Sequence, residues 1–381
     1  MAKSGTLVID IKRWNPEITD DDLQRYMSIV TFDLTAEQRE RIETPKAVYA
    51  MQDSVLALHW HPEFVPMECI RTRIEATFPN SNLELIIPTQ HNQLVSYDDY
   101  TGVEIDTYSK GFNLKVQLLA HFSKDRLSDA GVFKDMLAYT FKYRSSQLEE
   151  FIDSVLEPGY QERVNEAAAK TGAEDTLVNF VRNGVTKLKK LMEIKFSETP
   201  EFMRRNKIIQ LYFDSLRGEY GDSHIDRAQV FLKAVKKIVK RRFSPTHFYE
   251  TEEMIAEIRS LGGCIVVPHP EQFWPILLAD YDVDAYEVWN PQSLEYTDFL
   301  INVVSRQNSR RLAGERPLLI TMGDDCHMGE KTKPVHRQNL AKASREIGVQ
   351  PAWEDLQVKK SLILAGMDRR KTIEEYKSRL G

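Results

Sequence analysis

The chain has 381 residues, and 42% of them are hydrophobic, so a sizeable core can be buried. Its formal net charge of −6 argues against a general nucleic-acid-binding protein. Three scattered cysteines without a C-x-x-C pair argue against a disulfide framework and a thiolate zinc site. The first residues lack the pattern of a signal peptide, and no apolar run approaches the ~18 residues of a membrane span. We therefore expect a cytoplasmic protein with no membrane partner.

The first 50 residues carry no pattern that indicates chemistry, and we interpret residues 1–50 as an N-terminal extension. From residue 51 to residue 122, short apolar runs each end in polar residues. These runs lie at 54–58, 83–87, 102–105 and 114–120. Such runs are typical of strands in an α/β barrel. We expect residues 51–122 to form the first part of such a barrel.

Residues 123–250 have a different character, because Leu, Lys, Glu and Arg recur there at helical spacing. The expected helices lie at 147–156, 176–192, 202–216 and 226–242. A block of this length between strand-rich segments indicates an insertion. We interpret residues 123–250 as a helical insertion that covers the barrel mouth as a cap.

Alternation of strands and helices resumes at residue 251. We expect helices at 251–261 and 297–312, and strands at 264–267, 285–289 and 317–322. Residues 251–340 are therefore expected to complete the barrel. The remaining residues, 341–381, have the charged composition of a helical C-terminal tail.

The positions of the histidines are the main functional signal. Five of the nine stand at or just past the end of an expected strand: His59, His91, His121, His269 and His327. His61 follows two residues after His59, and the acids Glu104 and Asp325 occupy comparable positions. Active sites of parallel barrels are built at this end of the strands. One such histidine is more often a core residue, but the whole set predicts a site for divalent metal ions.

The spacing within the motifs favours the same chemistry. His59-Trp60-His61 has a period of two, so both imidazoles project from one face of an extended segment. Asp325-Cys326-His327 repeats this geometry with a carboxylate and an imidazole, both of which are metal ligands. Glu104 lies inside an apolar strand, where its charge is costly unless a cation compensates it. A carboxylate that bridges two metal ions meets this requirement.

In their order along the chain, the motifs resemble those of the PHP (polymerase and histidinol phosphatase) family of metal-dependent phosphoesterases. The similar segments are His59-Trp-His61, the run that ends in His91, Gly102-Val-Glu104, His121, Pro268-His-Pro270 and Gly323-Asp-Asp-Cys-His327. The resemblance covers roughly residues 51–121 and 251–335. It departs from the family at Gln90 and Asp324, where the family has an acid and a serine. Where the family has a longer first motif, this chain offers Glu63, either as a replacement metal ligand or as a surface carboxylate.

The resemblance implies a distorted (β/α)7 barrel that holds two or three divalent ions, which we expect to be Zn, Mn or Fe. The implied metal ligands are His59, His61, His91, Glu104, His121, His269, Asp325 and His327. Among these, we expect Glu104, Asp325 and His269 to take part in catalysis. The implied activity is hydrolysis of a small anionic, phosphorylated substrate by metal-activated water.

Two other interpretations remain open. An amidohydrolase-type enzyme that cleaves C–N or C–O bonds also combines a His-x-His motif, two later histidines and a final aspartate. A non-catalytic scaffold would keep the metal ligands and use the helical block to recruit a partner. The basic residues of 233–242 are compatible with nucleic-acid binding, but their spacing favours a solvated amphipathic helix. The oligomeric state has no signal in the sequence.

Overall fold

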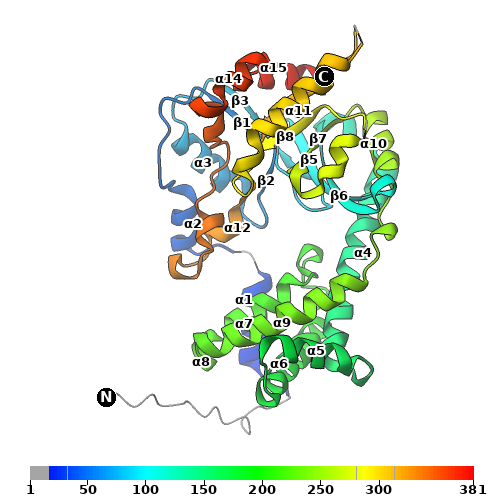
Figure 1. Ribbon diagram of the computed structural model, residues 1–381. Helices are drawn as coiled ribbons and strands as arrows, with labels where there is room; N and C mark the ends of the chain where they lie inside the picture. Colours follow the sequence, from blue (N-terminus) through cyan, green and yellow to red (C-terminus); the bar gives the residue numbers. More distant parts are fainter. Residues whose placement is uncertain (1–16, 32, 280, 313) are drawn as a thin grey trace. The chain divides into compact units, whose positions relative to one another are not determined.

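The computed structural model describes residues 17–31, 33–279, 281–312 and 314–381 (Figure 1). It divides into two compact units. The helical unit comprises the described residues of Met1–Asp33 together with Lys142–Ser244. The mixed unit comprises Leu34–Phe141 and Pro245–Gly381, and it contains the described strands.

The helical unit has a hydrophobic core of its own. Its helices are α1 (Asp20–Val30), the later part of α4 (Gly131–Leu156), α5 (Gln161–Thr171), α6 (Asp175–Ile194), α7 (Lys207–Ser215), α8 (Arg217–Tyr220) and α9 (Asp222–Arg242). Apolar residues at helical spacing, such as Val181, Phe213 and Phe231, are fully buried between these helices. Tyr26 and Val30 of α1 belong to the same core. A segment of the expected N-terminal extension therefore packs into the helical unit.

The strands of the mixed unit pair in three separate sheets. Their bounds are β1 (Ser54–Ala57), β2 (Trp60–His61), β3 (Leu83–Ile86), β4 (Val95–Tyr97), β5 (Tyr100–Ser109), β6 (Leu114–Ser123), β7 (Cys264–Val267), β8 (Ala285–Trp289), β9 (Leu319–Met322) and β10 (Cys326–His327). β1 pairs with β3, β2 pairs with β10, and β4 to β9 form one sheet in chain order. The fold is mixed α/β. Pairing among the described strands does not close a single ring, so the expected (β/α)7 barrel is not confirmed.

Strand direction changes within the six-stranded sheet. β5 and β6 form a long antiparallel pair, and β6 is also antiparallel to β7. Only β7, β8 and β9 run parallel to one another within this sheet. The register places His121 of β6 opposite Cys264, the first residue of β7. This differs from the expected parallel arrangement and determines where the end of β6 lies.

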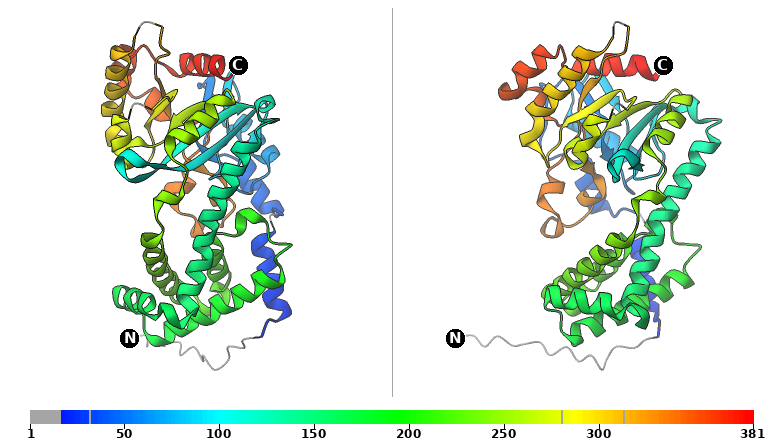
Figure 2. Two further views of the ribbon diagram at one scale, coloured as in Figure 1. Left: turned by 90° about the vertical axis from the view of Figure 1, so that its right-hand side faces the viewer. Right: turned by 45° about the vertical axis from the view of Figure 1, so that its right-hand side comes forward.

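Helices pack around the sheets of the mixed unit (Figure 2). They are α2 (Ala36–Glu43), α3 (Met67–Thr77), the first part of α4, α10 (Thr251–Ser260), α11 (Thr297–Arg310), α12 (Met328–Lys331), α13 (Leu340–Ala343), α14 (Leu356–Leu364) and α15 (Arg369–Leu380). α10 lies against β5 and β7, α11 against β8 and β9, and α15 against β1, β3 and β9. Ile373, Tyr376 and Leu380 of α15 are buried in the main core, so the tail segment is part of the mixed unit. No helix in the described part of the chain combines the length and apolar character that crossing a bilayer requires.

Candidate metal centre

Two short parallel strands bring the first and last motifs together. β2 and β10 pair with Trp60 opposite Cys326 and His61 opposite His327. Trp60 and Cys326 point into an apolar cluster, so the residues that flank them lie on the other face. The Asp325 amide also donates to the His59 carbonyl at 2.9 Å. The two members of each motif do lie together, with the His59 and His61 rings 5.5 Å apart and Asp325 Oδ1 3.3 Å from His327 Nε2, but His59 and Asp325 stand just outside the strands.

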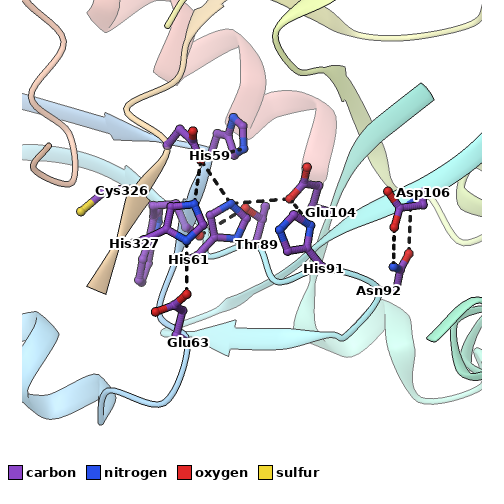
Figure 3. A network of polar contacts seen from close by, with 12 residues as sticks. His59, His61, Glu63, Thr89, His91, Asn92, Glu104, Asp106, Cys326 and His327 are labelled. Atoms are coloured by element: carbon purple, nitrogen blue, oxygen red, sulfur yellow. Dashed lines mark hydrogen bonds and ion pairs between the residues drawn. The ribbon is translucent and has the colours of Figure 1, made fainter. Parts of the chain in front are cut away.

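Glu104 enters the same site from β5. Its carboxylate oxygen Oε2 lies 2.7 Å from His91 Nδ1 and 3.5 Å from His61 Nε2 (Figure 3). Glu104 is 2% exposed, while the side chain of His91 is 32% exposed and stands at the edge of the site. An acid buried this deeply needs positive partners, which the surrounding imidazoles or a bound cation can supply.

Six of the eight expected ligands form overlapping groups that fit metal ions. Among the residues that the structure describes, the groups are His59, Glu104 and His269; His59, His61 and Asp325; and His61, His91 and Glu104. Within each group the ligand atoms lie within 4.8 Å of one another. His59, His61 and Glu104 each belong to two groups. The Glu104 carboxylate can bridge two ions, whereas each imidazole nitrogen ligates one ion, so the overlap fits neighbouring ions joined through Glu104.

The chemistry of the donors fits a divalent cation. Within the described residues, His269 Nδ1 is buried and forms no hydrogen bond. A buried polar atom without a partner costs about 1–3 kcal/mol, and a cation removes this cost for an imidazole nitrogen that ligates it. Imidazole nitrogens combined with carboxylate oxygens suit Zn, Mn and Fe. The residues present therefore fit such an ion.

The protonation states of Asp325, Glu104 and His61 also favour metal binding. Burial opposes ionisation of Asp325, but contacts with His327 and His61 hold the pKa of its carboxyl well below the usual range. Burial likewise opposes ionisation of Glu104, and His91 with other nearby imidazoles keeps its pKa low. Burial and the neighbouring His327 lower the pKa of His61 to about 3. Ionised carboxylates and a neutral imidazole are the forms that ligate metal.

Left-handed backbone occurs at three residues of the site. Asp325, His269 and Glu63 have φ angles of 46°, 30° and 54°. Residues other than glycine rarely adopt this region, and such strain concentrates at functional sites. The Glu63 side chain is 15% exposed and its Oε1 lies 3.3 Å from His327 Nδ1. Glu63 is therefore a member of the site and not a surface carboxylate.

His327 lies beside the three groups. Its Nε2 is 3.3 Å from Asp325 Oδ1, and its ring stacks on His61 with centroids 4.4 Å apart. Its side chain is 17% exposed, which places it between the buried ligands and solvent. The expected contact between Asp325 and His327 is present. Whether His327 itself ligates a metal stays a prediction.

His121, which we expected to ligate a metal, is not part of the cluster. Both of its ring nitrogens have protein partners: Nδ1 lies 2.7 Å from Tyr376 Oη, and Nε2 lies 3.0 Å from the Leu58 carbonyl. The reason is the antiparallel direction of β6, which places His121 opposite the first residue of β7. His269, in contrast, follows the last residue of β7. His121 is thus a fully buried core residue that supports the backbone next to His59.

If His121 is a core residue, replacing it should change the stability of the fold but not the metal content. We expect His121→Leu to lower the free energy of unfolding by about 1–3 kcal/mol, because the Leu58 carbonyl loses its buried partner. Metal bound per folded chain should stay unchanged, and Tyr376→Phe should give a smaller stability loss of the same kind. Denaturant titration and elemental analysis measure the two quantities. A loss of metal at unchanged stability would return His121 to the ligand set.

The structure adds Glu287, which the sequence prediction missed. Its Oε2 lies 2.7 Å from His59 Nδ1, and its Oε1 accepts hydrogen bonds from Asn290 and from the His269 amide. Burial opposes a charge on His59, but the Glu287 carboxylate raises the pKa of His59 to about 10. Glu287 thus holds a proton on Nδ1 and directs Nε2 toward Asp325. The signal was available, because Glu287 is an acid within an apolar strand, as Glu104 is.

Arg345 is the second missed residue. Its Nη1 donates to Asp325 Oδ2, and Gln292 donates to the same oxygen at 2.8 Å. Asp325 Oδ1 remains directed at His61 and His327. Arg345 is 7% exposed and lies outside any regular element. No spacing in the sequence marks it, because its contact with Asp325 depends on how the chain folds back after α13.

Comparisons with known proteins give distant similarity only. No protein-family model matches the chain, and no curated protein matches it. Among solved structures, it is similar to a proposed metal-dependent phosphoesterase from Bifidobacterium adolescentis, with a TM-score of 0.39, 16% identity, and coverage of 85% of this chain and 98% of that one. It is also similar to an amidohydrolase from Chromobacterium violaceum with bound sulfate and no metal, with a TM-score of 0.38, 12% identity, and coverage of 82% and 94%. The functional interpretation therefore depends on the geometry of the site.

Proposed function

We propose that this protein is a metal-dependent phosphoesterase of the PHP type, with two or three divalent ions in the site. The observation that carries the proposal is the set of three overlapping ligand groups that share His59, His61 and Glu104. The order of the motifs along the chain also supports a PHP-like barrel. When bound, the ions supply a water whose pKa is lowered toward ~7.

The charges in the site favour an anionic substrate. Glu104 and Asp325 contribute two negative charges at the ligand groups. Just outside them, the buried carboxylate of Glu287 is offset by the buried guanidinium of Arg345. Two divalent ions would leave a surplus of about two positive charges before Glu63 and a metal-bound hydroxide are counted, and a third ion would restore that surplus. Such a surplus suits a phosphate monoester dianion.

The chain's own residues hold this arrangement rigid. Arg345 and Gln292 fix one oxygen of Asp325, so that the other faces the imidazoles. Glu287 fixes the tautomer of His59, as carboxylates do for metal-binding histidines. His61 stacks between His91 and His327, which restricts rotation of its ring. These contacts position the ligands before any substrate arrives.

The test is a metal-analysed preparation assayed against phosphomonoesters, phosphodiesters, lactones and amides. We expect at least about two equivalents of Zn, Mn or Fe per chain, and phosphoester hydrolysis that a chelator abolishes and added metal restores. Less than one equivalent after reconstitution would remove the proposal. Hydrolysis of amides or lactones alone would assign an amidohydrolase-type reaction. Full metal content without hydrolysis of any substrate would favour a scaffold.

A further inference from the structure

A cavity of about 410 Å³ lies beside α9 in the helical unit, and we call it the α9 pocket. Its apolar wall includes Phe151, Ile209 and Leu232, and Val230, which is 54% exposed, is part of the same lining. This volume is in the range of sites that hold small organic ligands. All of its lining residues belong to the helical unit, whereas the metal-ligand groups belong to the mixed unit.

Two cationic side chains line the α9 pocket beside this apolar wall. Within the described part of the chain, neither Lys233 nor Lys236 has a hydrogen-bond or ion-pair partner. Burial, together with Lys240, Arg144 and Lys233, lowers the pKa of Lys236 to about 8. Positive charges gathered at an apolar surface repel one another, and an anion bound between them would relieve this repulsion.

In the described part of the chain, the acid of the pocket, Asp226, forms no ion pair with these lysines, and one of its amides, Asn206, has a buried oxygen without a partner. Asp226 forms an ion pair with Arg217 at 2.8 Å, and Arg217 also pairs with Asp214 and Asp222. Asn206 precedes α7 without capping it, and its Oδ1 is a buried atom for which the described residues offer no hydrogen-bond partner. The pocket therefore combines an apolar wall, two unpaired cations and an amide that can bond a polar group.

We propose that the α9 pocket binds a small molecule that has an apolar body and an anionic group, either a carboxylate or a phosphate. The apolar body would lie against Phe151, Ile209 and Val230, and the anionic group would contact Lys236 and Lys233. The contrast between an apolar wall and a localised positive charge selects such a ligand over a purely apolar or a purely ionic one. This binding is independent of the proposed hydrolysis.

Titration calorimetry on chelator-treated protein tests the proposal, because octanoate then cannot bind through a metal ion. We expect saturable binding of octanoate at one site, with acetate and octanol each at least tenfold weaker. Octyl phosphate distinguishes the two anionic groups. Tighter binding of octyl phosphate than of octanoate would indicate a phosphate ligand, and the reverse order would indicate a carboxylate. The affinity for octanoate should be unchanged in Asp325→Asn, because Asp325 does not line the α9 pocket. This result is expected whether or not the protein proves to be a hydrolase.

Matched variants locate the site. Lys236→Gln should weaken octanoate binding about tenfold or more, since it removes a charge-assisted hydrogen bond. Lys237→Gln is the control, because it makes the same charge change on an exposed neighbour in α9. Val230→Glu, at an exposed position of the lining, should also weaken binding without loss of folding. Equal losses from Lys236→Gln and Lys237→Gln, no effect of Val230→Glu, or equal affinity for acetate and octanoate would each overturn the proposal.

Discussion

Replacing Asp325 with asparagine is expected to lower metal affinity and to reduce hydrolysis by orders of magnitude. The substitution removes a negative charge and an ionised ligand oxygen from a group that contains His59 and His61. Asparagine tolerates the left-handed backbone of this position, where φ is 46°, so the local fold should persist. Elemental analysis, activity assays and circular dichroism measure the three effects.

Asp324→Asn is the internal control for this experiment. The two oxygens of Asp324 accept hydrogen bonds from the amides of Cys326 and Gly348, at 3.0 and 2.9 Å. An amide side chain has only one accepting oxygen, so this variant should lose thermal stability and keep its metal per folded chain. If Asp324→Asn loses as much metal as Asp325→Asn, the assignment of Asp325 as the ligand is wrong.

The second large effect is expected for Glu287→Gln, which should lower metal affinity by about 10- to 100-fold. The carboxylate of Glu287 faces His59 with one oxygen and accepts bonds from Asn290 and His269 with the other. A glutamine side chain has one accepting oxygen and one donating NH2 group. It therefore cannot accept hydrogen bonds both from His59 and from Asn290 and the His269 amide. The charge that favours the proton on His59 Nδ1 is also lost. Metal affinity is measured by competition with a chromogenic chelator.

A second variant tests the same positioning role without changing Glu287. A Cβ atom at Gly323 would collide with the Glu287 carboxylate, so Gly323→Ala should displace this group from His59. We expect it to reproduce the loss of affinity caused by Glu287→Gln. Glu295→Gln, at an exposed position, is the charge-matched control and should have no effect. Wild-type affinity in both Glu287→Gln and Gly323→Ala would show that Glu287 does not position the ligand.

Local structure was largely predictable from the sequence. The strands expected at 264–267 and 285–289 coincide with β7 and β8, and the helix expected at 251–261 differs from α10 by one residue. These segments are short apolar runs or amphipathic repeats, whose periodicity depends only on neighbouring residues. The proximity of His59 to His61 and of Asp325 to His327 was also predictable, since residues two apart in the chain are near neighbours, but the left-handed backbone of Asp325 was not.

Properties that depend on distant partners were not predictable. The direction of β6 depends on its pairing with β5 and β7, and nothing within residues 114–123 records it. The assignment of His121 failed for this reason. The association of α1 with the helical unit likewise depends on packing of Tyr26 against residues far along the chain. Arg345 reaches Asp325 through a chain reversal that has no periodic signal.

The placement of the helical unit within the chain has a consequence for protein synthesis. His61, His91 and Glu104 all leave the ribosome before Lys142–Ser244, so the residues of one ligand group are synthesised early. The two groups that contain His59 wait for His269 and Asp325, which emerge only after α9. Among the described strands, however, β2 pairs with β10, so His61 has its strand partner only after Cys326–His327 have been made. We therefore expect the ions to be loaded after the last motif has been synthesised, when Asp325 and Arg345 have joined the fold.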